Sequence, residues 1–240
     1  STAKSSRSTS NAAVTSMRTR ESHSTYGLAF TASHNPPGWN GLKVFHGSGA
    51  LLLPEETDRL EMQTNEMLPE EVVKIPLDVA IKAGIVELRD DTNAYVDQVE
   101  SFVDMACIRK AGLNVMVDPM YGVGHLTLGM ILSDARCRVT FIHERHNPLF
   151  GGRSPAPNLE ALRELRVNVQ EGGFHLGLAT DGDADRIAVV DEKGQYISTN
   201  DLLLLLYWYL HEIKNQSGGV IRNLSTTHML DRMAACFGEV

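Results

Sequence analysis

A serine between two short apolar runs is the first place in this 240-residue sequence where chemistry could occur. Ser33 lies in the stretch 31–43, which reads TASHNPPGWNGLK. The two prolines of this stretch lack backbone donors, so we expect a loop between two strands. A hydroxyl held on such a loop, with His34 and Lys43 near it, suits a nucleophile or a carrier of a phosphoryl group. An ordinary hairpin loop would show the same local pattern, so the interpretation depends on a second feature.

Three aspartates far along the chain supply that second feature. Asp181, Asp183 and Asp185 alternate with glycine and alanine in the stretch 181–186, DGDADR, between two apolar runs. Three negative charges in so small a volume would cost several kcal/mol unless a cation lay between them. Carboxylate oxygens are hard ligands that suit Mg²⁺, which also accepts phosphate oxygens. Arg186 can hold a phosphate or a sugar oxygen through its planar guanidinium group.

Two other interpretations of the aspartate stretch are an acidic surface turn and a calcium-binding loop. A calcium loop that began at Asp181 would have a glutamate at its twelfth position, and Glu192 stands there. Such a loop also needs glycine at its sixth position, where the chain has Arg186. The residues 187–190 read as a buried strand, which further favours the magnesium interpretation.

Together the stretches 31–43 and 181–186 closely resemble two motifs of the α-D-phosphohexomutase family, which includes phosphoglucomutase and phosphomannomutase. The first is similar to the family's phosphoserine loop and the second to its magnesium loop. Trp39 and the stretch 147–153, NPLFGGR, look more like phosphoglucomutases than phosphoglucosamine mutases. The similarity begins near Tyr26, and the chain looks like a fragment. The family's sugar-recognition loop is not found in it, so the sequence does not decide between glucose and mannose.

The resemblance implies a Mg²⁺-dependent phosphoryl transfer between hexose 1-phosphate and hexose 6-phosphate. Ser33 would carry the phosphoryl group and, with Asp181, Asp183 and Asp185, would hold the Mg²⁺ ion. Glucose 1,6-bisphosphate would be the activator and the enzyme-bound intermediate. A one-way phosphotransferase or phosphatase, and a truncated remnant that binds Mg²⁺ with little or no turnover, are the alternatives.

Three further roles follow from the same resemblance. Lys43 matches a lysine implicated in proton transfer or phosphate stabilisation. His34 matches a residue that supports the serine loop, and for it a structural and a catalytic role are equally open. Arg186 matches an arginine that reaches substrate or phosphate.

Composition limits the classes of partner and compartment. The net charge of −8 argues against a nucleic-acid-binding protein. The three cysteines form no C-x-x-C pair, so we expect a reduced, cytoplasmic protein. The apolar run 201–210 is too short to cross a membrane, which takes about 20 residues, and a buried helix is the better interpretation. The oligomeric state is not indicated.

The order of apolar runs predicts the fold class. Strand and helix patterns alternate in a βαβαβ order from 94 to 191, which indicates an α/β fold with a mixed, mostly parallel sheet and helices on both faces. The stretch 181–186 then follows the carboxyl end of a strand, where such sheets bind ligands.

The chain divides into four segments. Residues 1–25 are rich in serine, threonine and arginine, and we expect a disordered or unrelated N-terminal segment. The resemblance implies a truncated first domain with the phosphoserine loop and a linker at 26–92, and a complete second domain with the metal loop at 93–196. Only the beginning of a third domain would lie at 197–240, with a strand at 219–223.

Gly122 and Gly124 lie in an expected turn between a strand and a helix. Such a turn can cradle a phosphate on free backbone N–H groups. The spacing lacks the full G-x-G-x-x-G pattern, so close packing is the favoured explanation for these glycines.

Overall fold

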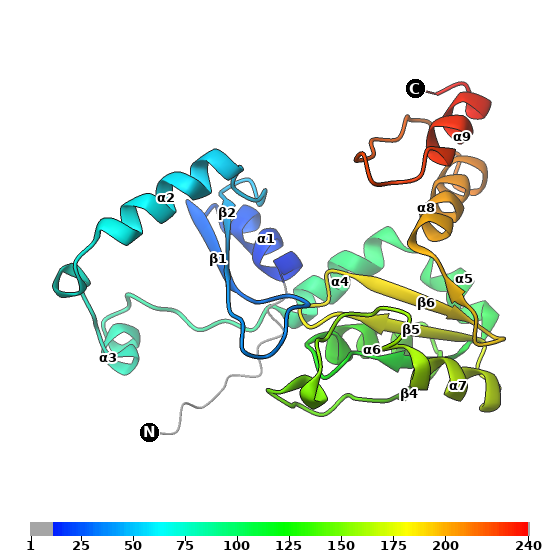
Figure 1. Cartoon of the computed structure of the whole chain (residues 1–240), viewed down its shortest axis with the longest axis horizontal. Helices are drawn as coiled ribbons and strands as arrows, with labels where there is room; N and C mark the ends of the chain where they lie inside the picture. The colour runs from blue at the N-terminus through cyan, green and yellow to red at the C-terminus, as the bar shows by residue number, and fades with distance from the viewer. Residues whose placement is uncertain (1–11, 240) are drawn as a thin grey trace.

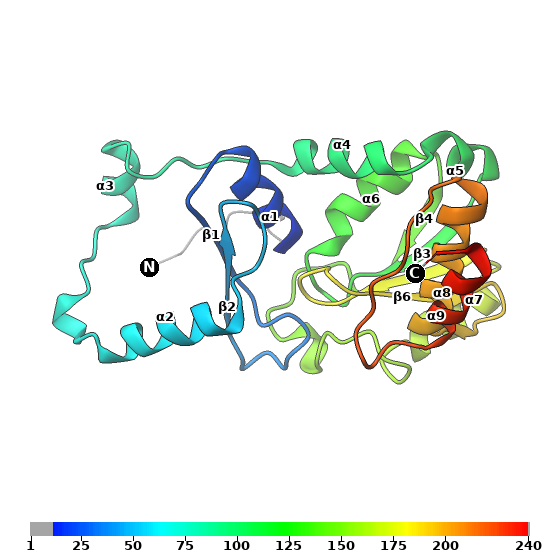
Figure 2. The same cartoon turned by 90° about the horizontal axis from the view of Figure 1, so that it is seen from above.

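The structure, a computed structural model, describes residues 12–239. An N-terminal pair of strands with its helices lies on one side, and a larger sheet with helices on both faces lies on the other (Figure 1). Two more helices follow the sheet at the C-terminal end. Figure 2 shows that α2 and α3 extend away from the sheet, whereas α4 runs back toward it.

The N-terminal strand pair holds the serine loop. Its elements are α1 (Ala12–Glu21), β1 (Tyr26–Phe30) and β2 (Leu42–His46). The two strands are antiparallel, and Ala29 pairs with Lys43. Successive strand residues point to opposite faces, so Ala29 is buried on the face that α1 covers with Val14 and Met17.

The expectation that residues 1–25 are disordered or unrelated is wrong for their described part. Residues 12–21 form α1, and Arg18 pairs with Asp91 at 2.7 Å. A segment with few apolar residues becomes ordered here because the hairpin offers a surface that they can cover. Residues 1–11 of that expectation lie outside the described residues.

Helices and one 3₁₀ turn connect the hairpin to the sheet. They are α2 (Pro54–Glu66), η1 (Pro69–Glu71), α3 (Leu77–Lys82), α4 (Thr92–Phe102) and α5 (Met105–Ala111). Pro54 begins α2, as predicted, because proline lacks only an N–H that the first turn leaves unpaired. The carboxylate of Glu56 accepts a hydrogen bond from the N–H of Leu53 at 2.9 Å and completes this end of the helix.

The main sheet of the described residues has five strands in the order β4-β3-β5-β6-β7. They are β3 (Asn114–Asp118), β4 (Arg138–Phe141), β5 (Leu176–Thr180), β6 (Ile187–Asp191) and β7 (Tyr196–Ile197). The α/β class with a mixed sheet is confirmed. Strand β3 pairs parallel with β4 and with β5, whereas β6 pairs antiparallel with β5 and with β7, so the sheet is not mostly parallel. Residues 181–186 alone connect β5 to β6, and so short a connection cannot make a parallel crossover.

Helices cover both faces of this sheet, as expected. They are α6 (Gly124–Asp134) on one face and α7 (Arg163–Glu171) on the other, with the 3₁₀ turn η2 (Phe150–Gly152) between them in sequence. Val115 and Val117 of β3 pack with Leu132 of α6, and Met116 packs with Leu165 of α7. These two apolar cores hold the carboxyl ends of β3 and β5 at one edge.

The C-terminal helices are more exposed than expected. They are α8 (Thr199–Trp208), the π-helical turn η3 (Tyr209–Ile213) and α9 (Met229–Phe237). The expectation of a buried helix at 201–210 is wrong, because α9 covers only part of α8 and leaves Leu205 and Leu206 more than half exposed. The strand expected at 219–223 does not form, since no strand of the described residues lies beside it to pair. Between residues 12 and 239, no helix is long and apolar enough to cross a membrane.

Candidate active site

The serine loop and the aspartate loop meet at the carboxyl end of β5. Ser33 lies in the connection between β1 and β2, and its hydroxyl donates to Asp181 Oδ2 at 3.0 Å. The two residues are 148 positions apart in the chain, so the fold alone brings them together. A hydroxyl therefore faces a carboxylate cluster, as the sequence analysis anticipated.

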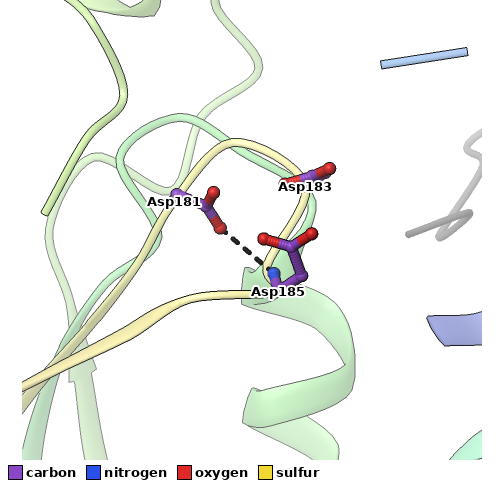
Figure 3. Close-up of side chains that lie close together, drawn as sticks. All are labelled: Asp181, Asp183 and Asp185. Atoms are coloured by element: carbon purple, nitrogen blue, oxygen red, sulfur yellow. Dashed lines mark hydrogen bonds between the residues drawn. The ribbon is translucent and has the colours of Figure 1, made fainter. Parts of the chain in front are cut away.

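Asp181, Asp183 and Asp185 lie on one short turn, and their carboxylates gather around one small volume (Figure 3). One oxygen from each lies within 4.8 Å of the others. Asp181 is fully buried, and its Oδ1 accepts hydrogen bonds from the N–H groups of Asp185 and Arg186, both at 3.1 Å. These backbone bonds fix the turn and hold its first carboxylate in place.

Asp183 has one satisfied and one unsatisfied oxygen. Its Oδ2 accepts hydrogen bonds from Thr31 Oγ1 and from Lys43 Nζ, each at 3.0 Å. Its Oδ1 is buried and has no hydrogen-bond partner among the described residues. A buried carboxylate oxygen without a partner is costly. The chemistry of this donor set, three carboxylates and a hydroxyl, fits a hard divalent cation such as Mg²⁺.

Lys43 is the cation that the described residues bring closest to this cluster of carboxylates. Its ammonium group also donates to Asp185 Oδ2 at 2.7 Å. Burial lowers the pKa of Lys43, but its hydrogen bonds to Asp185 and Asp183 outweigh burial and leave that pKa above the ordinary lysine value. Lys43 therefore stays charged at neutral pH and offsets part of the negative charge.

The carboxylates differ in their electrostatics. Burial and the neighbouring charge of Asp183 raise the pKa of Asp181 to about 6. Burial also acts on Asp183, but hydrogen bonds from Lys43 and Thr31 outweigh it and hold the pKa of Asp183 below its ordinary value. The protein alone thus stabilises the charged form of Asp181 less than that of Asp183, and a bound cation would relieve Asp181 more.

His34 and Arg186 lie at the edges of the same site. His34 Nδ1 is 3.5 Å from Ser33 Oγ. Arg186 Nε is 3.9 Å from Asp181 Oδ2, and the Arg186 side chain is half exposed, so its guanidinium group can reach an anion in solvent. The structure therefore brings all of the site residues predicted from the sequence to one place; their chemical roles stay predictions.

Two residues of the site were missed in the sequence. Thr31 accepts a hydrogen bond from the N–H of Ser33 at 2.8 Å while it donates to Asp183. A threonine two residues before a loop serine is a recognisable turn signal, so Thr31 could have been found. Ser154 donates to the carbonyl oxygen of His34 from a distant loop, and no local pattern announces such a contact.

Gly122 shows why glycine follows β3. A Cβ atom at Gly122 would lie 2.5 Å from the carbonyl oxygen of Gly182. The next residue, Val123, donates its N–H to that same oxygen at 3.1 Å. The packing explanation for this glycine is confirmed, because the aspartate loop passes directly against it.

The structure is thus a mixed α/β fold that presents a hydroxyl to three carboxylates at a sheet edge, and this donor set fits a hard divalent cation. Two family models match the chain: phosphoglucomutase/phosphomannomutase alpha/beta/alpha domain I over residues 8–70, and domain II over residues 93–194. Together they match more than half of the chain. The chain belongs to the phosphoglucomutase/phosphomannomutase family, and the match over 8–70 extends the family similarity well before Tyr26.

Individual relatives agree with the family models. A phosphoglucomutase/phosphomannomutase of Thermococcus kodakarensis is 30% identical over 87% of this chain and 44% of its own length. A phosphopentomutase of the same organism is 33% identical over 85% of this chain and 43% of its own length. A crystal structure described as a phosphomannomutase of Thermus thermophilus superposes with a TM-score of 0.82 and 26% identity, over 95% of this chain and 50% of that one. The chain thus spans less than half the length of the curated relatives named here.

Proposed function

We propose that this chain is the serine- and metal-bearing part of a phosphohexomutase, and that Ser33 carries the phosphoryl group. The observation that supports this most strongly is the 3.0 Å contact between Ser33 Oγ and Asp181 Oδ2 inside a cluster of three carboxylates. Membership in a family of phosphomutases supports it independently. Because the chain spans less than half the length of its named relatives, the activity is proposed for the protein of which it forms part.

The proposed reaction moves a phosphoryl group from the serine to the sugar and back. The O–P bond of phosphoserine 33 breaks and Ser33 Oγ takes up a proton, while the free hydroxyl oxygen of a hexose 1-phosphate loses its proton to a base and forms a new O–P bond. The hexose 1,6-bisphosphate then reorients. The O–P bond at the 1-oxygen of the sugar then breaks and that oxygen takes up a proton, while Ser33 Oγ loses its proton and forms a new O–P bond. Phosphoserine 33 and hexose 6-phosphate remain.

Asp181, Asp183 and Asp185 would hold Mg²⁺ beside Ser33 in this reaction. The bound ion supplies positive charge that offsets the charge of the transferring phosphoryl group. The chain's own residues prepare the serine for transfer. Thr31 Oγ1 accepts a hydrogen bond from the N–H of Ser33, and Asp181 accepts one from the Ser33 hydroxyl. The hydroxyl therefore points into the cluster before any phosphate binds.

Lys43, His34 and Arg186 supply the remaining groups of the proposal. Lys43 stays protonated and can stabilise phosphate oxygens or donate a proton. His34 Nδ1 is near enough to Ser33 Oγ to take its proton after a small movement of the ring. Arg186, at the open side of the cluster, can bind a phosphate or a sugar oxygen of the substrate.

Glucose phosphate is the proposed substrate. Trp39 and the stretch 147–153 favour it, by the same resemblance that identified the serine loop. The names of the relatives span hexose and pentose phosphates, so the sugar needs direct measurement. Competing glucose 1-phosphate and mannose 1-phosphate in one assay would measure the preference.

Phosphoryl uptake tests the proposed function. We expect the purified chain, incubated with glucose 1,6-bisphosphate and Mg²⁺, to gain the mass of one phosphoryl group at Ser33, and the Ser33→Ala variant to gain none. Ser48→Ala is the matched control, because Ser48 is exposed in the turn after β2, where its hydroxyl accepts a hydrogen bond from the N–H of Ala50. Labelling that persists in Ser33→Ala would place the carrier elsewhere.

A remnant that binds Mg²⁺ with little turnover is the second candidate function. The observation that favours it is the length of the chain, which spans 44% and 43% of the two Thermococcus relatives. Such a protein would bind Mg²⁺ at the aspartate cluster yet take up no phosphoryl group from the bisphosphate. Calorimetry with Mg²⁺ and mass measurement after incubation with bisphosphate therefore separate the two candidates.

A further inference from the structure

A third loop, residues 150–155, lies against the place where the serine and aspartate loops meet. A Cβ atom on Gly182 would lie 2.7 Å from the carbonyl oxygen of Ser33, 3.2 Å from Pro155 Cγ and 3.5 Å from the Phe150 ring. The serine loop and the 150–155 loop, which are distant in sequence, therefore converge on one glycine of the aspartate loop. No side chain fits at this junction, which leaves little freedom for any of the three segments.

Ser154 links the 150–155 loop to the serine loop. Its hydroxyl donates to the carbonyl oxygen of His34, the residue that follows Ser33. Ser33 itself has a φ angle of +52°, in the left-handed region that residues other than glycine seldom adopt. Such a conformation persists only where the surroundings enforce it. A hydrogen bond to the neighbouring carbonyl oxygen is a direct means of enforcing it.

The 150–155 loop is in turn anchored to the end of the sheet. A Cβ atom on Gly151 would lie 2.7 Å from Tyr121 Cε2, so the loop backbone rests on that ring. The rings of Tyr121 and His143 are 4.9 Å apart, and His143 Nδ1 contacts the buried carboxylate of Asp118 at 3.0 Å. Asp118 is the last residue of β3, so contacts run from the sheet core to the base of the 150–155 loop.

We propose that Ser154 is a positioning residue that holds Ser33 in its left-handed conformation, with its hydroxyl directed at Asp181. The inference deepens the proposed function and rests on it, because positioning matters for phosphoryl transfer. Ser154 touches neither substrate nor metal in this account and acts through the His34 carbonyl group. Loss of its hydroxyl would let the serine loop sample other conformations and reduce the fraction of molecules ready for transfer.

Hydrogen exchange measures this positioning without any requirement for activity. In Ser154→Ala we expect the amides of residues 31–41 to exchange about five to ten times faster, the effect of losing one hydrogen bond, while amides of β5 and β6 keep their rates. Ser154→Thr keeps a hydroxyl and should restore slow exchange. Ser101→Ala is the matched control, because Ser101 also donates to a backbone carbonyl, that of Gln98, at the end of α4.

Three results would overturn the proposal. One is unchanged exchange of residues 31–41 in Ser154→Ala. The second is equal acceleration in every segment or failure of that variant to fold, either of which would make Ser154 a general stabilising residue. The third is a Ser154→Thr variant that exchanges as fast as Ser154→Ala.

Phosphoryl uptake then connects positioning to chemistry. At saturating Mg²⁺ we expect the maximal rate of Ser33 labelling by glucose 1,6-bisphosphate to fall about tenfold in Ser154→Ala, with the half-saturating bisphosphate concentration unchanged. An unchanged rate would contradict the positioning role. If the unmodified chain takes up no phosphoryl group, the proposed function fails, whereas the exchange measurement still decides whether Ser154 holds the serine loop.

Discussion

At the scale of single residues, Asp183 carries the case for a cation. One of its oxygens is bonded by Thr31 and Lys43, and the other is buried without a partner in the described part of the chain. Protein interiors seldom leave a carboxylate oxygen in this state. A divalent ion shared with Asp181 and Asp185 would satisfy that oxygen and would also relieve the raised pKa of Asp181.

Replacing Asp183 with asparagine tests this interpretation. Asp183→Asn removes one negative ligand from the cluster. We therefore expect the dissociation constant for Mg²⁺, measured by calorimetry, to rise about tenfold to a hundredfold. Asp78→Asn provides the control, because the Asp78 side chain lies on α3 and is 71% exposed. Equal Mg²⁺ affinities in the two variants would contradict a metal site at Asp183.

The residues of this site differ in how far the sequence could reveal them. The alternating aspartates and the serine that precedes two prolines can be recognised in the sequence. A high local charge density and prolines without backbone N–H groups are both local properties of the chain. Ser154 has no such signal, since a side-chain bond to the carbonyl oxygen of a residue 120 positions away depends on the tertiary fold. Its role in the serine loop could only emerge from the structure.

At the scale of elements, the aspartate loop is held by the turn that precedes α6. Gly122 lies so close to Gly182 that the two backbones touch. This contact, together with the hydrogen bond from the Val123 N–H, places the carboxylates opposite Ser33. The turn and the aspartate loop therefore form one packed unit.

A methyl group at Gly122 should disturb that unit. In Gly122→Ala the added Cβ would lie 2.5 Å from a backbone oxygen, so the aspartate loop must shift. We expect the free energy of unfolding to fall by about 1–3 kcal/mol and Mg²⁺ to bind more weakly, as measured by urea unfolding and calorimetry. Gly38→Ala is the control, since a Cβ atom there meets nothing within 4 Å. Wild-type stability and affinity in Gly122→Ala would contradict the close contact.

Helices and strands could be predicted where the apolar pattern was strong. The predictions failed where the order or burial of an element depended on the elements packed against it. The strands β3 to β6 of the main sheet follow from their apolar runs, whereas the two-residue strand β7 was not predicted. Helix α1 was missed because its serines and threonines resemble a disordered segment, and its order depends on the hairpin that it covers. The exposure of α8 could not be read from its leucines, because burial depends on what lies against a helix.

At the scale of the whole molecule, the chain presents a site without most of the length that its relatives use. It spans 43–44% of the two Thermococcus proteins. The proposed carrier Ser33 and the aspartate cluster both lie within residues 12–239, so we expect phosphoryl uptake from this chain. The proposed turnover would also need the bisphosphate to be kept and reoriented, for which we expect a larger binding surface to be necessary.

We therefore expect low turnover from this chain alone. In a coupled assay that converts glucose 1-phosphate to glucose 6-phosphate with Mg²⁺ and trace bisphosphate, its rate should be at least about a hundredfold below that of a full-length relative. The Thermococcus phosphoglucomutase/phosphomannomutase, assayed under the same conditions, provides the reference. A comparable rate would mean that these 240 residues suffice for catalysis.

The meeting of the serine loop with the aspartate cluster is tested most directly by paramagnetic NMR. Mn²⁺ takes the same oxygen ligands as Mg²⁺ and broadens the signals of nearby nuclei. We predict that Mn²⁺ erases the amide signals of residues 31–35 together with that of Ala184, that α3 keeps its signals, and that Asp183→Asn prevents the loss. Residues 31–35 that keep their signals while that of Ala184 disappears would show that the two loops are apart in solution.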